Sequence, residues 1–222
     1  MIKGILFDLD NTLYDYDACD REAQKVLEKW CFQNLNIERT QFQNCYEQSK
    51  KMVKQQLGNV GASHNRLLYM QNFLELLGKP PVLYALEMYD IYWNTMLEKM
   101  ERFDYVLPLF QWLQERKIKI GILTDLTAHI QHRKIRALQL EEYVDILVSS
   151  EEAGREKPEA CIFDLMIRKM QLLPEELLMV GDSMMKDIQG AEAVGMEAVW
   201  FEKTEPVQSG RYVRERIEGK IL

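Results

Sequence analysis

The feature that most constrains the fold is a set of five short runs of mainly apolar residues, four of which are followed directly by acidic or hydroxyl residues or by Gly-Asp. Runs of this kind are typical of strands buried on both faces of a parallel sheet. The runs are Ile2–Phe7, Ile118–Leu123, Ile146–Val148, Leu177–Val180 and Ala198–Phe201. Helical patterns separate the later runs, which predicts an α/β domain with a Rossmann-like, doubly wound parallel sheet. Ligands bind such sheets at the carboxyl ends of the strands, where these polar residues fall.

The segment between the first and second runs has a different character, because it contains no strand-like run. Its periodicity predicts four amphipathic helices, with glycine or proline in the later links. They are expected at roughly Asp17–Asn34, Arg39–Leu57, Ala62–Leu77 and Pro81–Met100. We therefore expect residues 1–14 and 103–222 to form the core domain. Residues 15–102 are expected to form a small all-helical cap domain, inserted after the first strand and placed over the active site.

Composition narrows the possible partners. The net charge of -7 provides no general attraction for a nucleic acid polymer or an anionic membrane. The sequence has no apolar stretch of membrane-spanning length, and its first apolar run is too short for a signal peptide. The four cysteines are scattered without a CxxC pair, so neither a zinc site nor a disulfide framework is indicated. We expect a cytoplasmic protein, monomeric or homodimeric, that captures a small ligand through local groups.

The first polar motif is Phe7-Asp8-Leu9-Asp10-Asn11-Thr12, directly after the first predicted strand. Two aspartates spaced two apart can both point into the crevice at the sheet edge. Their mutual repulsion favours a proton on one of them unless a cation lies between them. That arrangement suits a pair in which one carboxylate attacks phosphorus and the other handles protons. An isolated Asp-x-Asp is also common in solvated acidic turns.

Three further motifs follow later strands. The second motif, Thr124-Asp125, lies at the end of the second predicted strand. The Thr124 hydroxyl could donate to a phosphoryl oxygen, or it could cap the next helix. Thr127 could fill the capping role equally well. Lys157 precedes a proline at a helix start and could neutralise charge in the crevice, although such lysines are usually solvated.

The last motif is Gly181-Asp182-Ser183-Met-Met-Lys186-Asp187. It offers Asp182 as a hard oxygen ligand and Ser183 as a helix cap, and Asp187 follows one turn further on.

These four motifs, in this order, resemble those of the haloacid dehalogenase-like hydrolases, specifically the phosphatases with a helical cap inserted after the first motif. The resemblance implies that Asp8 is the nucleophile, forms an aspartyl-phosphate, and is assisted by Asp10 as general acid and base. It assigns phosphate binding to the Thr124-Asp125 motif and Lys157. It also implies a Mg²⁺ cofactor, held by the residues Asp8 (carboxylate), Asp10 (backbone carbonyl) and Asp182, with Asp187 and Ser183 in support.

Asp125 departs from the pattern of the family, in which asparagine is common at this position. A carboxylate there would repel a phosphate dianion if it faced inward without a cation partner. The expected activity is hydrolysis of a small phosphate monoester, with a nucleoside 5'-monophosphate as a candidate because the motifs are similar to those of pyrimidine nucleotidases. Sugar phosphates and phosphoglycolate are further candidates.

Three alternatives stay open. A phosphomutase of the β-phosphoglucomutase kind would use the same core residues. A haloacid dehalogenase would also use an aspartate nucleophile, but it needs no proton donor, so Asp10 argues for phosphate chemistry. A catalytically silent binding protein is the alternative from another class, and it would usually have lost a motif carboxylate or the lysine.

Overall fold

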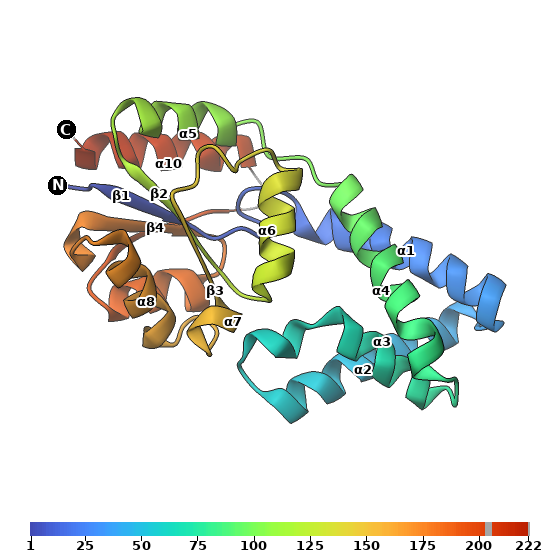
Figure 1. The fold of residues 1–222 in the computed structure, drawn as a ribbon. Helices are drawn as coiled ribbons and strands as arrows, with labels where there is room; N and C mark the ends of the chain where they lie inside the picture. Colours follow the sequence, from blue (N-terminus) through green and yellow to red (C-terminus); the bar gives the residue numbers. More distant parts are fainter. Residues whose placement is uncertain (203–205, 222) are drawn as a thin grey trace.

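A computed structural model describes residues 1–202 and 206–221, and its centre is a five-stranded parallel sheet (Figure 1). The spatial order is β3-β2-β1-β4-β5, so β1 lies in the middle. The strands are β1 (Gly4–Phe7), β2 (Lys119–Thr124), β3 (Ile146–Ser149), β4 (Leu177–Gly181) and β5 (Glu197–Trp200). All five predicted strands and the α/β fold class are confirmed, with strand ends shifted by one or two residues. Since every strand is parallel, all their carboxyl ends lie at one edge of the sheet.

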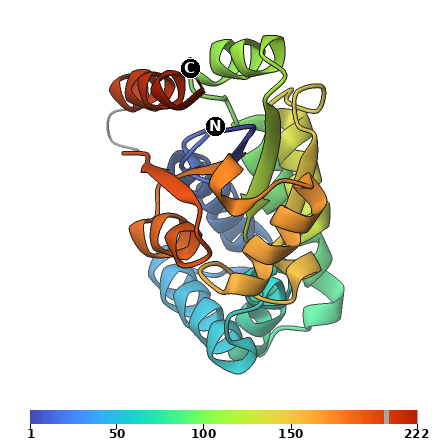
Figure 2. The same cartoon turned by 90° about the vertical axis from the view of Figure 1, so that its left-hand side faces the viewer.

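Helices cover both faces of this sheet because alternate strand residues point to opposite faces. Ile5 and Phe7 belong to one apolar cluster, together with residues of α5, α6 and α10, whereas Leu6 belongs to a second cluster with α8 and α9. Figure 2 shows α5 and α10 above the sheet. The helices and short turns of this part are α5 (Val106–Glu115), α6 (Ala128–Ala137), α7 (Ser150–Ala153), α8 (Ala160–Met170), η2 (Pro174–Glu176), η3 (Met184–Gln189), α9 (Gly190–Ala193) and α10 (Pro206–Ile221).

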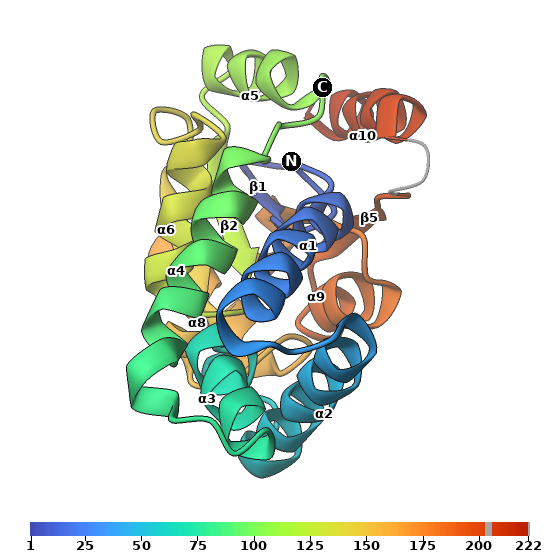
Figure 3. The ribbon, with the colours of Figure 1, turned by 90° about the vertical axis from the view of Figure 1, so that its right-hand side faces the viewer.

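Between β1 and β2 the chain forms a helical block that lies beyond the carboxyl ends of the strands (Figure 3). The third predicted helix is interrupted: the Asn65 side chain accepts a hydrogen bond from the Leu67 amide, so a new helix begins there after a short 3₁₀ turn. Asp15 caps the first helix through Ala18 N in the same way. The elements of the block are α1 (Tyr16–Leu35), α2 (Arg39–Leu57), η1 (Gly61–His64), α3 (Arg66–Leu76) and α4 (Pro81–Glu98).

The helical block meets the sheet domain again at η1. A Cβ added to Gly61 would lie 2.6 Å from the backbone nitrogen of Glu151 in α7, so only glycine permits this close approach. The helical character predicted for this segment is confirmed. The division into a core of residues 1–14 and 103–222 and a cap of 15–102 stays a prediction, and residues 203–205 and 222 of that core lie outside the described part.

Candidate active site

The register of the sheet brings three of the four motifs to one place. Phe7 of β1 lies level with Ile122 of β2 and with Val180 of β4. Asp8 follows at once, and its backbone amide continues the ladder by donating to Val180 O at 2.9 Å. The ends of β1, β2 and β4 therefore place Asp8, Thr124 and Asp182 around one cavity. Between β1 and β4 the direction in which strands are added reverses, which is the usual binding position in such sheets.

Lys157, from the third motif, lies at the centre of this site. Its Nζ donates to Asp8 Oδ1 and to Asp187 Oδ1, each at 2.6 Å, and to the Leu123 carbonyl at 2.9 Å. Its side chain is almost fully buried. Burial alone would lower the pKa of Lys157, but Asp187 and Asp8 raise it above its usual value, so this lysine stays cationic.

Asp8 and Asp187 share this single ammonium, which leaves an excess of negative charge in a buried place. Burial raises the pKa of Asp8 well above its usual range; Lys157 opposes this effect, and Asp187 and Asp10 add to it. A further cation would favour the ionised form that a nucleophile requires. Carboxylate oxygens of Asp8, Asp182 and Asp187 all lie within 4.8 Å of one another. This set of hard oxygen donors fits Mg²⁺.

Gly181 and the turn after it hold the Asp187 carboxylate in position. A Cβ on Gly181 would collide with the Asp187 side chain, so the glycine lets that carboxylate lie against the end of β4. Asp187 Oδ2 accepts from the Ser183 amide at 2.9 Å, and Ser183 Oγ accepts from Lys186 N at 3.2 Å. Ser183 therefore caps the following helical segment, as the sequence predicts. That segment begins as a π-helix, which the periodicity did not indicate.

Asp10 has its own cation, which the sequence did not reveal. Lys134 Nζ, from α6, lies 2.7 Å from both Asp10 carboxylate oxygens, and the Tyr14 hydroxyl donates to Oδ1 at 2.7 Å. The Lys134 side chain is fully buried, and its pKa is lowered by burial although Asp10 opposes this. One signal existed: Lys134 stands four residues after Ile130, on the apolar face of its helix. A lysine there must have a buried partner.

Thr124 is nearly fully buried and is oriented by Gln131, a second residue that the sequence did not single out. Gln131 Nε2 donates to Thr124 Oγ1 at 2.6 Å and to the Asp125 carbonyl at 2.5 Å. The Thr124 hydroxyl thus accepts a hydrogen bond from Gln131, and it donates to the Asp125 carbonyl at 3.3 Å. Neither Thr124 nor Thr127 caps α6 with its side chain. The Ala128 amide donates to the Glu151 carboxylate instead, at 2.8 Å.

Asp125 lines the same cavity and is neutralised within it. Lys186 Nζ lies 2.7 Å from Asp125 Oδ2, and the Lys157 amide donates to Asp125 Oδ1 at 3.0 Å. Lys186 belongs to the fourth motif, and no pattern in the chain indicated that it would pair with the second motif. The ion pair reduces the repulsion that an extra carboxylate would exert on a phosphate.

Glu156 connects the site to the helical block. One of its carboxylate oxygens accepts from Ser63 Oγ and faces His64 Nε2, each at 2.9 Å, and the other lies 3.1 Å from Lys186 Nζ. Its amide donates to the Asn59 carbonyl at 3.2 Å. Burial raises the pKa of Glu156, but His64, Lys186 and Ser63 outweigh that effect and lower it to about 2.

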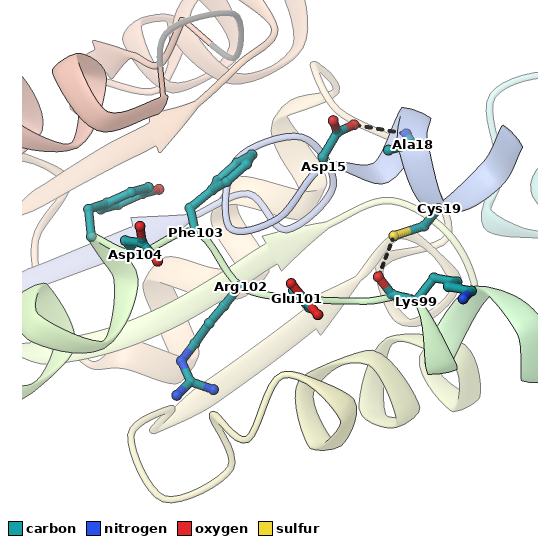
Figure 4. A pocket seen from close by; sticks show the side chains of 9 residues that line it. Asp15, Ala18, Cys19, Lys99, Glu101, Arg102, Phe103 and Asp104 are labelled. Atoms are coloured by element: carbon teal, nitrogen blue, oxygen red, sulfur yellow. Dashed lines mark hydrogen bonds between the residues drawn. The ribbon is translucent and has the colours of Figure 1, made fainter. Parts of the chain in front are cut away.

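The cavity of about 420 Å³ has the size of a small-molecule site and is lined by both parts of the chain. A second hollow of about 330 Å³ lies where the helical block rejoins the sheet domain (Figure 4). There Cys19 Sγ donates to the Lys99 carbonyl, and the two hollows share no lining residue within the described part of the chain. The candidate catalytic, phosphate-binding and metal-binding residues all line the cavity of about 420 Å³.

Comparison with known proteins shows the family to which the chain belongs. The family model described as haloacid dehalogenase-like hydrolase matches residues 5–201. A ribulose-1,5-bisphosphate 5-phosphatase from Halopiger xanaduensis is 38% identical, over 92% of this chain and 87% of the relative. A glyceraldehyde 3-phosphate phosphatase from Methanopyrus kandleri is 31% identical, over 90% of this chain and 83% of the relative.

Solved structures share the fold. A 2-haloacid dehalogenase from Pseudomonas syringae pv. Tomato superposes with a TM-score of 0.74 at 22% identity, covering 90% of this chain and 86% of that one. A haloacid dehalogenase-like phosphatase from Thermococcus onnurineus gives 0.67 at 24% identity, with the same coverage. The chain belongs to the haloacid dehalogenase-like hydrolase family, and the expected enzyme class, a phosphatase acting on phosphoric monoesters, is confirmed. Within the described residues, no helix is long and apolar enough to cross a membrane.

Replacing Glu156 by glutamine tests the contact between η1 and the site. A carboxylate whose pKa is lowered from 4.5 to about 2 stabilises the folded state above pH 4.5, and this contribution disappears as the pH falls toward 2. We expect Glu156→Gln to lower the free energy of unfolding by on the order of 2 kcal/mol at pH 6, and by less than half as much at pH 3. Urea unfolding at both pH values measures this.

The exposed neighbour Glu159 provides the matched control for this experiment. Glu159→Gln should change the free energy of unfolding by less than about 0.5 kcal/mol at either pH. An effect of Glu156→Gln that is the same at pH 6 and pH 3 would contradict the assignment of an ionised, paired carboxylate.

Proposed function

We propose that this phosphatase is Mg²⁺-dependent and hydrolyses a small phosphate monoester through a phosphorylated Asp8. The observation that carries the proposal is the position of the Asp8 carboxylate. It lies at the end of the central strand, faces the cavity, and is held by the Lys157 ammonium. A buried carboxylate with a fixed cation beside it is suited to attack an anionic phosphoryl group, because the cation reduces the repulsion between them.

The chemistry would proceed in two steps. In the first, Asp10 starts protonated: an Asp8 oxygen attacks phosphorus, the bond from phosphorus to the ester oxygen breaks, and Asp10 gives its proton to that departing oxygen. In the second, Asp10 takes a proton from water, the water attacks the same phosphorus, and the bond from phosphorus to Asp8 breaks. Inorganic phosphate leaves, and both carboxyl groups return to their initial protonation states.

The other residues of the site would position these groups. Lys157 and the Thr124 hydroxyl would hold phosphoryl oxygens, and Lys134 with Tyr14 fixes the Asp10 carboxylate. Asp8, Asp182 and the Asp10 backbone carbonyl would hold Mg²⁺, with Asp187 in support. When bound, the ion would neutralise charge shared between the nucleophile and the phosphate.

Small phosphorylated sugars are the substrate class that we propose. The relatives at 38% and 31% identity are named for ribulose 1,5-bisphosphate and glyceraldehyde 3-phosphate, which supports this choice over a nucleotide. A pyrimidine nucleoside monophosphate stays a prediction from the motifs and belongs in the same panel. Asp10 supports phosphate transfer over dehalogenation, since a departing halide needs no proton.

Turnover should require both Asp8 and the metal. We expect Asp8→Asn to reduce phosphate release on the order of a thousandfold or more, because an amide cannot act as the nucleophile. EDTA should abolish release by the wild type, and added Mg²⁺ should restore it. The assay measures inorganic phosphate from ribulose 1,5-bisphosphate, glyceraldehyde 3-phosphate, phosphoglycolate and UMP.

Asp164→Asn, at an exposed position on α8, is the matched control and should retain wild-type turnover. The proposal fails if Asp8→Asn keeps its activity. It also fails if folded wild type releases no phosphate from any of the esters in the presence of Mg²⁺.

Lys134 acts as a positioning residue in this scheme, and the leaving group can reveal that role. Lys134→Met should lower kcat about tenfold or more for an alkyl phosphate, whose departing oxygen needs the Asp10 proton. The loss should be much smaller for p-nitrophenyl phosphate, because p-nitrophenolate leaves without protonation. Arg133→Met, next to it but contacting the exposed Asn94, should affect neither. Equal losses for both esters would mean that Lys134 serves stability alone.

A further inference from the structure

Basic side chains from the helical block line the cavity together with the carboxylates of the sheet edge. They are Lys50 and Lys54 of α2, His64 of η1 and Arg66 of α3. The two lysines of the catalytic motifs are each matched to carboxylates: Lys157 to Asp8 and Asp187, and Lys186 to Asp125 and Glu156. The basic residues of the block are outside these pairs, apart from His64, which faces Glu156.

Arg66 supplies a fixed positive charge to this wall. Its guanidinium donates to the His64 carbonyl at 2.8 Å and to the hydroxyl of Tyr16, and it stacks against the rings of Tyr69 and Trp93. Within residues 1–202 and 206–221, no carboxylate lies in ion-pair distance of it. The charge is therefore held in place by uncharged partners, one of which, the Tyr92 hydroxyl, in turn donates to the Asp20 carboxylate.

Lys54 adds a second positive charge that no described carboxylate pairs with. Lys54 is an exposed residue on the cavity wall; partial burial of its ammonium and the like charges of Lys50 and Arg66 lower its pKa, while Glu156 opposes them. Lys50 pairs only with Glu47, three residues earlier on the exposed side of the same helix, at 2.8 Å. Such surface pairs contribute little to stability.

Lys50 and Lys54 are four residues apart, so they lie on the same face of α2, where like charges repel. The repulsion would be relieved by an anion between them and Arg66. On the α1 side of the cavity, the Asp20 carboxylate accepts hydrogen bonds from Tyr92 and Gln24, and within the described residues it forms no salt bridge with either lysine.

We propose that the α2 face of the cavity is a second anion subsite, in which Lys54, assisted by Lys50, binds a phosphate or carboxylate at the far end of the substrate. This inference rests on the proposed function, because it assigns the other end of the same substrate to Asp8. The substrate class is then a sugar bisphosphate or a phosphorylated sugar acid. A cavity of about 420 Å³ can accommodate either.

The test compares substrates that differ in their far end. We would measure kcat/KM for a sugar bisphosphate, for 3-phosphoglycerate, and for p-nitrophenyl phosphate, whose far end is not anionic. The quantity compared is kcat/KM for the better anionic substrate divided by kcat/KM for p-nitrophenyl phosphate. In Lys54→Gln this ratio should fall about tenfold relative to the wild type, because one charge-assisted hydrogen bond is lost. The change should appear in KM. A preference for the sugar bisphosphate would show that the subsite binds a phosphate. A preference for 3-phosphoglycerate would show that it binds a carboxylate.

Lys51→Gln is the matched control, because Lys51 is an exposed lysine of the same helix that does not line the cavity. Its ratio should equal that of the wild type. An unchanged ratio in Lys54→Gln overturns the subsite and leaves the proposed function intact, as does a wild type that hydrolyses all three esters with equal kcat/KM.

A binding measurement separates the subsite from the chemistry. Calorimetry with the sugar bisphosphate and Mg²⁺ would use Asp8→Asn as the background, so that turnover is not needed. Adding Lys54→Gln to that background should weaken binding about tenfold, whereas adding Lys51→Gln should not. Equal affinity in the two double variants would overturn the subsite. If binding follows this expectation while the wild type hydrolyses no ester, the proposed function fails and the anion subsite stands.

Discussion

The ammonium of Lys157 between Asp8 and Asp187 is the interaction on which the rest of the site depends. It joins three segments that are far apart in the sequence: the end of β1, the loop before α8 and the segment after β4. Taking such charges out of water is costly unless each finds a partner. The parallel sheet makes this pairing possible, because it brings the ends of β1 and β4 side by side. One lysine can therefore form ion pairs with both carboxylates.

Two further aspartates of the site are also paired with a lysine. Lys134 holds Asp10, and Lys186 holds Asp125. A chain with a net charge of -7 thereby presents a cavity in which a phosphate meets fixed cations as well as carboxylates. The lysines of α2 add positive charge on the side of the cavity formed by the helical block. Glu156, which contacts both η1 and Lys186, connects the position of the block to that of the site.

Much of the fold could be predicted because its signals are local. Short apolar runs define the buried strands, and a polar residue after a strand lies at the sheet edge whatever the rest of the chain does. Lys134 and Gln131 could not be assigned, since their partners depend on how α6 packs across the strand ends. The partner of Asp125 was missed for a similar reason: Lys186 reaches it from another strand end. The break in the third predicted helix was missed because the apolar periodicity continues across Asn65, which caps the start of α3.

The central claim, that Asp8 becomes phosphorylated, can be tested most directly with Asp10→Asn and p-nitrophenyl phosphate. The leaving group departs without a proton, so the first step can occur, whereas the second step lacks the base that activates water. We expect a burst of one p-nitrophenolate per enzyme molecule and a phosphorylated Asp8 in the peptide mass spectrum. Absence of both, under conditions in which the wild type hydrolyses the same ester, would contradict it.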